Sequence, residues 1–302
     1  MDIRELQIFL AIARERSVSG AAKHLYMTPQ GVSKILKNLE AELDCQLFHR
    51  SKAGMSLTES GNYFFAYARD SVERSKQMRG ELLRIKQRQM QVVDLLSAYG
   101  ILRLVTPECI LAFRREHPEI ELLYREYPDL QVEKLFAEGE GNVAFSIGEF
   151  DEKAHHILPL ETFEVKMLVN KANPLSCRES VTIEDLKGQP LYIESDQFYI
   201  YRLIMERCQA AGFEPEIVFE TSGFSLCNKM VQQNKGVSVM VDFIYEDMSN
   251  GDVKLIPFSD GAYCWSACML TRRGEEENVA VSCFQKHVKN WLEKIKNGEI
   301  QR

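Results

Sequence analysis

Short polar and cationic side chains recur at helical spacing just after residue 28. They are Gln30, Ser33, Lys34, Lys37 and Asn38. An amide can pair with the edge of an adenine, while hydroxyl and ammonium groups can reach bases or phosphates. Donors of these types along one exposed helix face are what a helix lying in the major groove of DNA needs. The pattern therefore predicts a DNA-reading face, and the solvated face of an ordinary amphipathic helix is the alternative.

The sequence indicates both the start and the buried face of the helix that would carry these groups. Thr28 followed by Pro29 is typical of an N-cap and a first helical residue. Apolar residues recur at helical spacing on the opposite face, namely Val32, Ile35, Leu36 and Leu39. A short helix with small apolar residues is expected just upstream, on Ala21, Ala22 and Leu25. Residues 2–16 predict a further helix that supports this pair.

A tight polar loop follows. Leu47 and Phe48 predict a return to the core, and residues 49–54 predict a loop that carries Arg50 and Lys52. The residues predicted to contact DNA are Thr28, Pro29, Gln30, Ser33, Lys34, Lys37, Arg50 and Lys52.

Many motifs occur here in one order. They are AA-x-x-L, a turn, T-P-Q-G-V-S, L-x-x-L-E, L-F-x-R and S-L-T-x-S-G. This order resembles the winged helix-turn-helix of LysR-type transcriptional regulators over roughly the first 60 residues. The resemblance implies a linker-helix dimer, a two-lobed effector domain and a tetramer. Family members often carry an arginine where Ala53 stands, so the wing contacts would fall to Arg50 and Lys52.

Length and charge fit this division. A chain of 302 residues is long enough for two or three domains. Residues 1–90 hold 15 Lys and Arg against 10 Asp and Glu, a net charge of +5, and the rest holds 22 against 34, a net charge of −12. DNA binding needs a locally basic surface rather than a basic chain. The charge asymmetry therefore supports an N-terminal DNA-binding part.

Several classes of protein are disfavoured. No stretch approaches the roughly 20 apolar residues of a membrane helix, and the charged N-terminus is not a signal peptide, so a cytoplasmic protein is expected. The 8 cysteines contain no C-x-x-C pair and predict reduced thiols, and the 6 histidines lack ligand spacing, so no metal or other cofactor is expected. No P-loop, G-x-S-x-G or dinucleotide-binding motif supports an enzyme, and no catalytic residue is predicted.

The peroxide-sensing branch of the family offers a further comparison. That branch carries a reactive cysteine in the second lobe and a partner cysteine nine residues further along. Here Tyr199 stands at the reactive position and Cys208 at the partner position. Redox sensing by that route is therefore not expected, because it needs a reactive thiolate.

A single long helix is predicted over residues 59–89, which contain no proline. Its apolar seam recurs at a spacing near 3.5 and consists of Phe64, Ala68, Met78, Leu82 and Ile85. Such a seam on a charged helix predicts dimerisation, and docking on its own domain is the alternative.

Strands and helices alternate from about residue 90, which favours a parallel sheet with covering helices. One helix is expected over 101–116, and Asp129 is expected to cap the helix that follows it. Two lobes with two crossovers resemble a periplasmic binding protein. The predicted first lobe is 90–162 and 268–302, and the second is 163–267.

A ligand in such a fold lies between the lobes, at strand ends and helix N-termini. The residues predicted to contact it are Ser97, Tyr99, Gly100, Ile101, Gly148, Ser195, Phe198, Tyr199, Tyr201, Thr221 and Phe224. The aromatic members favour a small, partly flat or apolar effector, with a carboxylate as an open option. Plain core packing of about half of them is the alternative.

The sequence thus predicts an α+β multidomain transcriptional regulator. Residues 1–58 would bind DNA as a winged helix-turn-helix, 59–89 would form the linker helix, and 90–302 would bind the effector. Its predicted partners are an inverted-repeat operator in double-stranded DNA, a small-molecule effector and a second copy of itself, and not a membrane. An architectural DNA-binding protein without an effector and an α/β enzyme are the alternatives.

Overall fold

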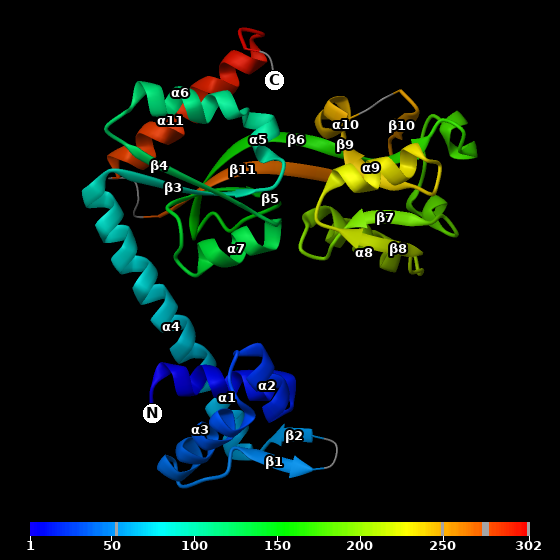
Figure 1. Cartoon of the computed structure of the whole chain (residues 1–302). Coiled ribbons are helices and arrows are strands. Elements are labelled where there is room, and N and C mark those ends of the chain that lie inside the picture. Colours follow the sequence, from blue (N-terminus) through cyan, green and yellow to red (C-terminus); the bar gives the residue numbers. More distant parts are fainter. Residues whose placement is uncertain (52–53, 249–250, 274–277, 301–302) are drawn as a thin grey trace. The chain divides into compact units, whose positions relative to one another are not determined.

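The computed structural model describes residues 1–51, 54–248, 251–273 and 278–300. The chain forms two compact units, Met1–Leu83 and Arg84–Arg302 (Figure 1). Each unit has its own buried apolar cluster.

The N-terminal unit is a three-helix core with a two-stranded hairpin. Its elements are α1 (Ile3–Glu15), α2 (Val18–His24), α3 (Pro29–Glu42), β1 (Phe48–Ser51), β2 (Gly54–Leu57) and the start of α4 (Glu59–Met90). A capping box at Asp2 begins α1, and the Thr28 hydroxyl accepts a hydrogen bond from the backbone N–H of Gly31 at 3.1 Å to begin α3. The Phe9 ring lies 5.1 Å from that of Phe48 and fixes the hairpin on the helices.

The helix α4 changes character along its length. Phe64 and Ala68 are buried in the core of the N-terminal unit, where the Phe64 ring lies 4.9 Å from that of Phe9. Met78, Leu82 and Ile85 are 52%, 60% and 46% exposed. The first two seam residues therefore dock on their own domain, and the last three leave an apolar stripe uncovered within the described residues.

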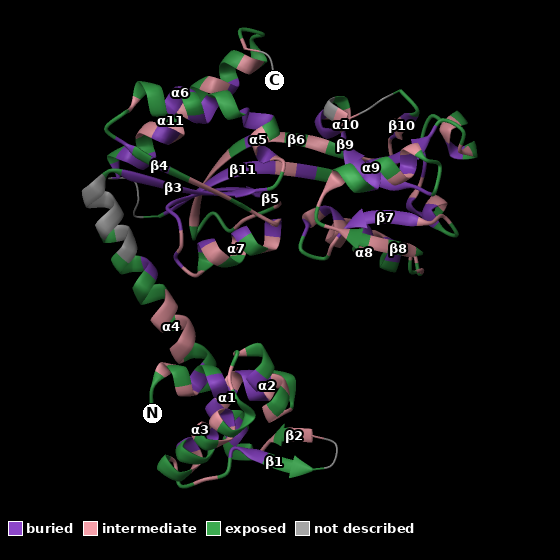
Figure 2. Cartoon of the chain, viewed as in Figure 1, coloured by how far each residue is buried: buried purple, intermediate pink, exposed green. Residues whose placement is uncertain are grey.

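The C-terminal unit is built on one continuous sheet in the order β10-β6-β11-β5-β3-β4, with β9 paired to β6. These strands are β3 (Val92–Ala98), β4 (Glu121–Tyr127), β5 (Val143–Ile147), β6 (His155–Asn170), β9 (Ser238–Val241), β10 (Val253–Ile256) and β11 (Cys264–Arg272). The strand β3 runs parallel to β4 and β5 and is buried along its whole length, as Figure 2 shows. A strand covered on both faces fits its largely apolar sequence, in which Asp94 and Ser97 are the buried polar members.

Two strands pass from one lobe to the other. Residues 155–164 of β6 pair with β11, whereas Val165 to Asn170 pair with β9 and β10. The first lobe also holds α5 (Ile101–Val105), α6 (Pro107–Glu116), α7 (Asp129–Ala137) and α11 (Val279–Lys296). The second lobe holds α8 (Tyr199–Ala210), α9 (Phe224–Gln232), α10 (Asp242–Met248) and the parallel pair β7 (Leu191–Glu194) and β8 (Ile217–Thr221).

The expected helix over 101–116 is in fact two helices. Thr106, at φ 69°, separates α5 from α6, and Pro107 opens α6. The residue before a proline is disfavoured in the helical region, so the chain breaks there and restarts. Within the described residues no helix is long and apolar enough to cross a membrane.

Candidate functional site

The exposed face of α3 carries the donors that the sequence predicts for DNA. Val32, Leu36 and Leu39 are buried against α1 and α2, which turns the opposite face outward. Gln30 and Lys34 are exposed there. The buried side of the helix thus fixes the direction in which the donors point.

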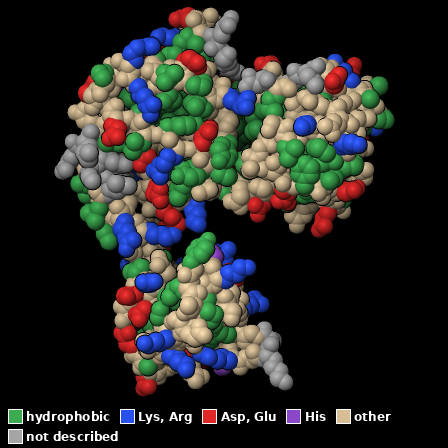
Figure 3. All heavy atoms as spheres, in the orientation of Figure 1, with side chains coloured by type: hydrophobic (Ala, Val, Ile, Leu, Met, Phe, Trp, Pro, Cys, Tyr) green, Lys and Arg blue, Asp and Glu red, His purple; other side chains and the backbone are tan. Residues whose placement is uncertain are grey.

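A hollow of about 600 Å³ lies over this face. It is lined by Val18, Pro29, Gln30, Ser33, Lys34, Lys37, Asn38 and Arg50. Arg50 comes from β1, so the hairpin and α3 contribute to one surface. Thr28 caps α3 at its edge, while Lys52 lies outside the described residues. In Figure 3 several Lys and Arg side chains lie on the visible face of this unit.

A second site lies between the lobes of the C-terminal unit. A cleft of about 250 Å³ is lined by Tyr99, Gly100, Leu102, Arg103, Glu126, Glu194, Ser222, Gly223, Phe224, Ser225 and Met248. Three of the predicted effector residues, Tyr99, Gly100 and Phe224, therefore line one cleft. Phe198 stacks behind Tyr99, with ring centroids 6.1 Å apart.

Gly100 lines this cleft in a left-handed backbone conformation. Its φ of +89° is a conformation that favours glycine, and a Cβ there would lie 3.6 Å from the Phe224 ring. The backbone conformation at this position therefore favours glycine, whereas an added Cβ would meet the Phe224 ring at an ordinary contact distance.

The other predicted effector residues lie elsewhere. Ser97 and Ile101 are fully buried. The backbone N–H of Ser195 donates to the carbonyl oxygen of Thr221 at 2.8 Å, so these two hold β7 beside β8. Tyr201 lines a separate hollow of about 870 Å³ on the second lobe.

Gly148 and Tyr199 meet across the lobes. Gly148 has a φ of +119°, and a Cβ at this position would lie 3.3 Å from the Tyr199 ring. The Tyr199 ring packs against the position that a side chain at Gly148 would occupy. This pair therefore fills the space between β5 and α8 and does not line the 250 Å³ cleft.

Two buried acidic residues of the interlobe region were not among the predicted effector residues. Glu194 ends β7, is only 4% exposed and lines the cleft. Asp129, at 2% exposure, begins α7. Burial raises the pKa of Asp129 to about 7. Burial, followed by the charge of Asp129, raises the pKa of Glu194 well above its usual range.

The expected role of Asp129 as a cap of its own helix is wrong. Pro128 holds the N-cap position of α7, and the Asp129 carboxylate accepts a hydrogen bond from the backbone N–H of Tyr199 at 2.8 Å. Arg202 of α8 forms an ion pair of 3.3 Å with Glu133 of α7. The starts of these two helices are thereby joined across the lobes.

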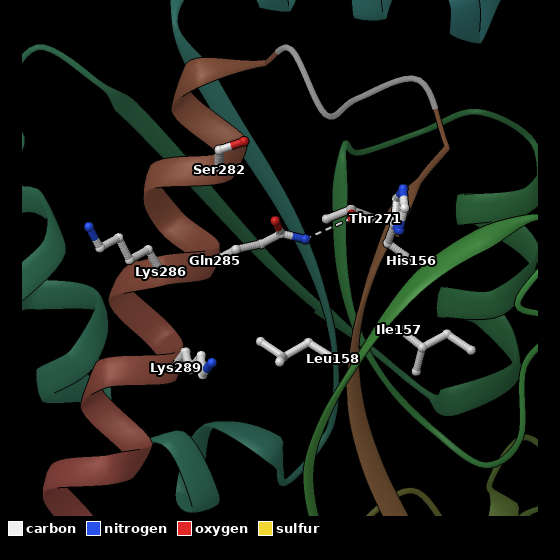
Figure 4. A pocket seen from close by; sticks show the side chains of 8 residues that line it. All are labelled: His156, Ile157, Leu158, Thr271, Ser282, Gln285, Lys286 and Lys289. Atoms are coloured by element: carbon white, nitrogen blue, oxygen red, sulfur yellow. Dashed lines mark hydrogen bonds between the residues drawn. The ribbon is translucent and has the colours of Figure 1, made fainter.

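A further hollow of about 470 Å³ lies on the first lobe between α11, β6 and β11. Figure 4 shows its lining side chains, which are His156, Ile157, Leu158, Thr271, Ser282, Gln285, Lys286 and Lys289. Gln285 reaches across from α11 and donates to the Thr271 hydroxyl at 2.8 Å. Its lysines are exposed, and none of its residues was predicted to bind an effector.

All 8 cysteines are free thiols. Burial raises the pKa of Cys208 to about 11, and burial also raises that of Cys268 to about 12. A thiol that stays protonated is a poor nucleophile, so these positions are unsuited to peroxide chemistry. No cluster of potential metal ligands occurs among the described residues.

Comparison with known proteins identifies the chain. Residues 3–62 match the profile of the bacterial regulatory helix-turn-helix protein, lysR family, and residues 94–293 match that of the LysR substrate binding domain. The chain is 26% identical over 296 residues to the uncharacterized HTH-type transcriptional regulator YwbI of Bacillus subtilis, covering 97% of each protein. It is also 26% identical over 244 residues to AlsR of the same organism, covering 79% of this chain and 80% of AlsR.

Solved structures share the fold. Full-length BenM superposes with a TM-score of 0.55 at 21% identity, covering 99% of this chain and 98% of BenM. A full-length OxyR variant from Pseudomonas aeruginosa gives a TM-score of 0.56 at 21% identity, covering 95% and 99%. The predicted winged helix-turn-helix and two-lobed α/β domain are confirmed. The chain therefore belongs to the LysR-type transcriptional regulators, which bind DNA through a helix-turn-helix and respond to a small-molecule effector, and it is not an enzyme.

Proposed function

We propose that this regulator binds an inverted-repeat operator as a homodimer and that an effector bound between its lobes changes promoter output. The observation that carries the DNA part is the division of α3. One face is buried, and the other presents donors that share a hollow with Arg50. A helix with this division can lie in a major groove while its apolar face stays in the core.

The roles within the operator follow from side-chain chemistry. Gln30 suits an adenine edge, Ser33 suits a base or a phosphate, and Lys34 and Lys37 suit phosphates. Arg50 and Lys52 would hold the wing on the adjacent backbone. The net charge of +5 on residues 1–90 supports phosphate binding by this part of the chain.

The dimer would form through α4. Met78, Leu82 and Ile85 are exposed apolar residues at helical spacing, which supports packing against a second copy of the helix. Two such dimers would give the tetramer that the family resemblance implies. A cytoplasmic location stays a prediction that follows from the DNA-binding role.

The effector would occupy the 250 Å³ cleft. Tyr99 and Gly100 come from the first lobe and Phe224 from the second, so a ligand there would touch both lobes. Binding to both would favour the closed arrangement and shift the population toward it. Closure of the two lobes would then change how the subunits assemble on DNA. This change in their positions is the step that would alter promoter output.

Footprinting of the purified full chain on the DNA that flanks its own gene tests this proposal. We expect a protected inverted repeat that survives an excess of shuffled competitor DNA, and sedimentation of the same sample should give a dimer or a multiple of it. Protection that follows no sequence would favour the architectural alternative and contradict the proposal.

A further inference from the structure

A buried carboxylate without a hydrogen-bond partner faces the interlobe cleft. Glu194 is only 4% exposed, and its Oε1 atom accepts no hydrogen bond from any described residue. The same side chain lines the 250 Å³ cleft. An ionised carboxylate is costly to bury without a partner, so the group either holds a proton or awaits a ligand that can pair with it.

The surroundings of Glu194 do not supply that partner. Burial and, after it, the charge of Asp129 raise the pKa of Glu194. The Oδ1 atom of Asp129 is itself buried without a hydrogen bond from any described residue. Glu126 adds a third carboxylate at the exposed rim, where Arg103 is the cation of the lining. Arg103 is exposed whereas Glu194 is buried, so the inner part of the cleft is the acidic part.

The rest of the lining also suits a positive charge. Tyr99 and Phe224 bring aromatic rings from the two lobes to the same cleft, and rings attract a desolvated cation through their faces. The volume of about 250 Å³ lies below the range of typical drug-sized pockets, so the ligand must be compact.

We propose that the effector is a small organic cation, bearing an ammonium or amidinium group, and that this group pairs with the Glu194 carboxylate. The proposal rests on the proposed function, since it assigns the charge of the ligand in the same cleft. A carboxylate elsewhere on the ligand is compatible with it, because α9 begins at Phe224 without a side-chain cap and its first residues line the cleft.

Pairing implies a proton balance. Because the pKa of Glu194 is raised in the free protein, a bound cation would displace a proton from the carboxyl oxygen to solvent. Cation binding should therefore tighten as the pH rises, and titration calorimetry in two buffers of different ionisation enthalpy should detect the released proton.

The experiment is a thermal-shift screen of the full chain against matched sets of compounds. Each set shares one ring, as in benzylamine, phenylalanine, benzamide and benzoate, or cyclohexylmethylamine and cyclohexanecarboxylate. We expect stabilisation from amine-bearing members alone. Glu194→Gln, which keeps the shape and removes the charge, should weaken their binding by about 30-fold or more.

Glu220→Gln is the matched control. Glu220 is exposed on the neighbouring strand β8 and does not line the cleft, so the same chemical change there should leave amine binding unaltered. The melting temperatures of both free variants show whether each is folded.

The outcomes separate the two proposals. One outcome is that neutral or anionic compounds bind to the chain and that Phe224→Ala, but not Glu194→Gln, abolishes their binding. This outcome overturns the cationic effector and keeps the effector cleft. Amine binding that survives both substitutions places the site elsewhere and overturns both proposals. The absence of any amine response at every pH tested also overturns the cationic effector.

Discussion

The carboxylate of Asp129 caps a helix in the opposite lobe. It accepts a hydrogen bond of 2.8 Å from the backbone N–H of Tyr199, the first residue of α8, although Asp129 itself begins α7. The first amide groups of a helix have no partner within the helix, so a carboxylate there can accept a hydrogen bond from one of them. Its negative charge also interacts favourably with the positive end of the helix dipole. This bond makes the start of α8 depend on the first lobe.

Substitutions at Asp129 should separate its role as an acceptor from its charge. Asp129→Asn keeps an oxygen that can accept from Tyr199, whereas Asp129→Ala removes the acceptor. At pH 8 we expect the Ala variant to be about 1–2 kcal/mol less stable than the Asn variant, the usual cost of a lost N-cap. Urea unfolding of the C-terminal unit measures the difference. Equal stability of the two variants would mean that water replaces the capping oxygen.

The charge of Asp129 should also make stability depend on pH. Its pKa is raised from 3.8 to about 7 by burial, so between these values the folded protein holds a proton that the unfolded chain has lost. The contribution of Asp129 to the free energy of unfolding should therefore be greatest below about pH 4 and should fall by up to about 4 kcal/mol as the pH rises to about 7. Above about pH 7 this contribution should change no further. Asp129→Asn should flatten this slope in unfolding experiments at pH 5, 6, 7 and 8. If Asp129→Asn keeps the full slope, another group is responsible for the pH dependence, and Glu194 is the next candidate.

The α3 surface could be predicted from sequence because its determinants are local. The period of Val32, Leu36 and Leu39 fixes which face is buried, and the cap at Thr28 fixes where the helix begins. The break at Thr106 was also available locally, since Pro107 follows it directly. The prediction of a single helix over 101–116 is wrong because it runs through this break.

The acidic interior of the cleft could not be predicted in the same way. Glu194 is one carboxylate at the end of an otherwise apolar strand, a position from which a side chain can equally turn to solvent. In the fold it is buried, and it lies near enough to Asp129, 65 residues away in the sequence, for the charge of Asp129 to add to the effect of burial on its pKa. The cap that Asp129 gives to Tyr199 spans 70 residues, whereas capping rules read only neighbouring residues. Contacts between segments far apart in the sequence therefore determine the burial of Glu194 and the capping role of Asp129, which local sequence patterns do not predict.

Substitutions on α3 should have two different effects on DNA binding. Gln30→Ala removes a base-reading amide and should relax specificity at one base pair of each half-site, at about 1–3 kcal/mol. Lys34→Ala removes a phosphate contact and should weaken binding to all sequences while it lowers the salt slope by about one per contact. Titrations of cognate and mutated operators at several salt concentrations distinguish the two.

Lys289→Ala provides the charge control for Lys34→Ala. It removes the same ammonium group from an exposed position on α11, in the other compact unit, and should leave DNA affinity unchanged. If Gln30→Ala and Lys34→Ala both bind the operator as the unmodified chain does, α3 is not the reading helix.

The exposed part of α4 should control assembly. Leu82 is 60% exposed in the single chain, so Leu82→Glu costs little burial within the subunit. In a dimer the same change would place a charge in an apolar interface, where an unpaired charge is strongly unfavourable. We expect Leu82→Glu to fold normally, to sediment as a monomer and to lose binding to a full operator.

Two further variants distinguish assembly from folding. Gln77→Glu adds the same charge five residues before Leu82, at an exposed position off the Met78, Leu82 and Ile85 stripe, and should remain a dimer. Phe64→Ala removes a buried ring that packs against Phe9, and should lower the stability of the N-terminal unit by about 3 kcal/mol without a direct effect on the stripe. Sedimentation of all three proteins at equal concentration, with melting curves beside it, gives the comparison. An intact dimer in a well-folded Leu82→Glu would show that the stripe is not the dimer contact, and the exposed apolar residues of α4 would then need another partner.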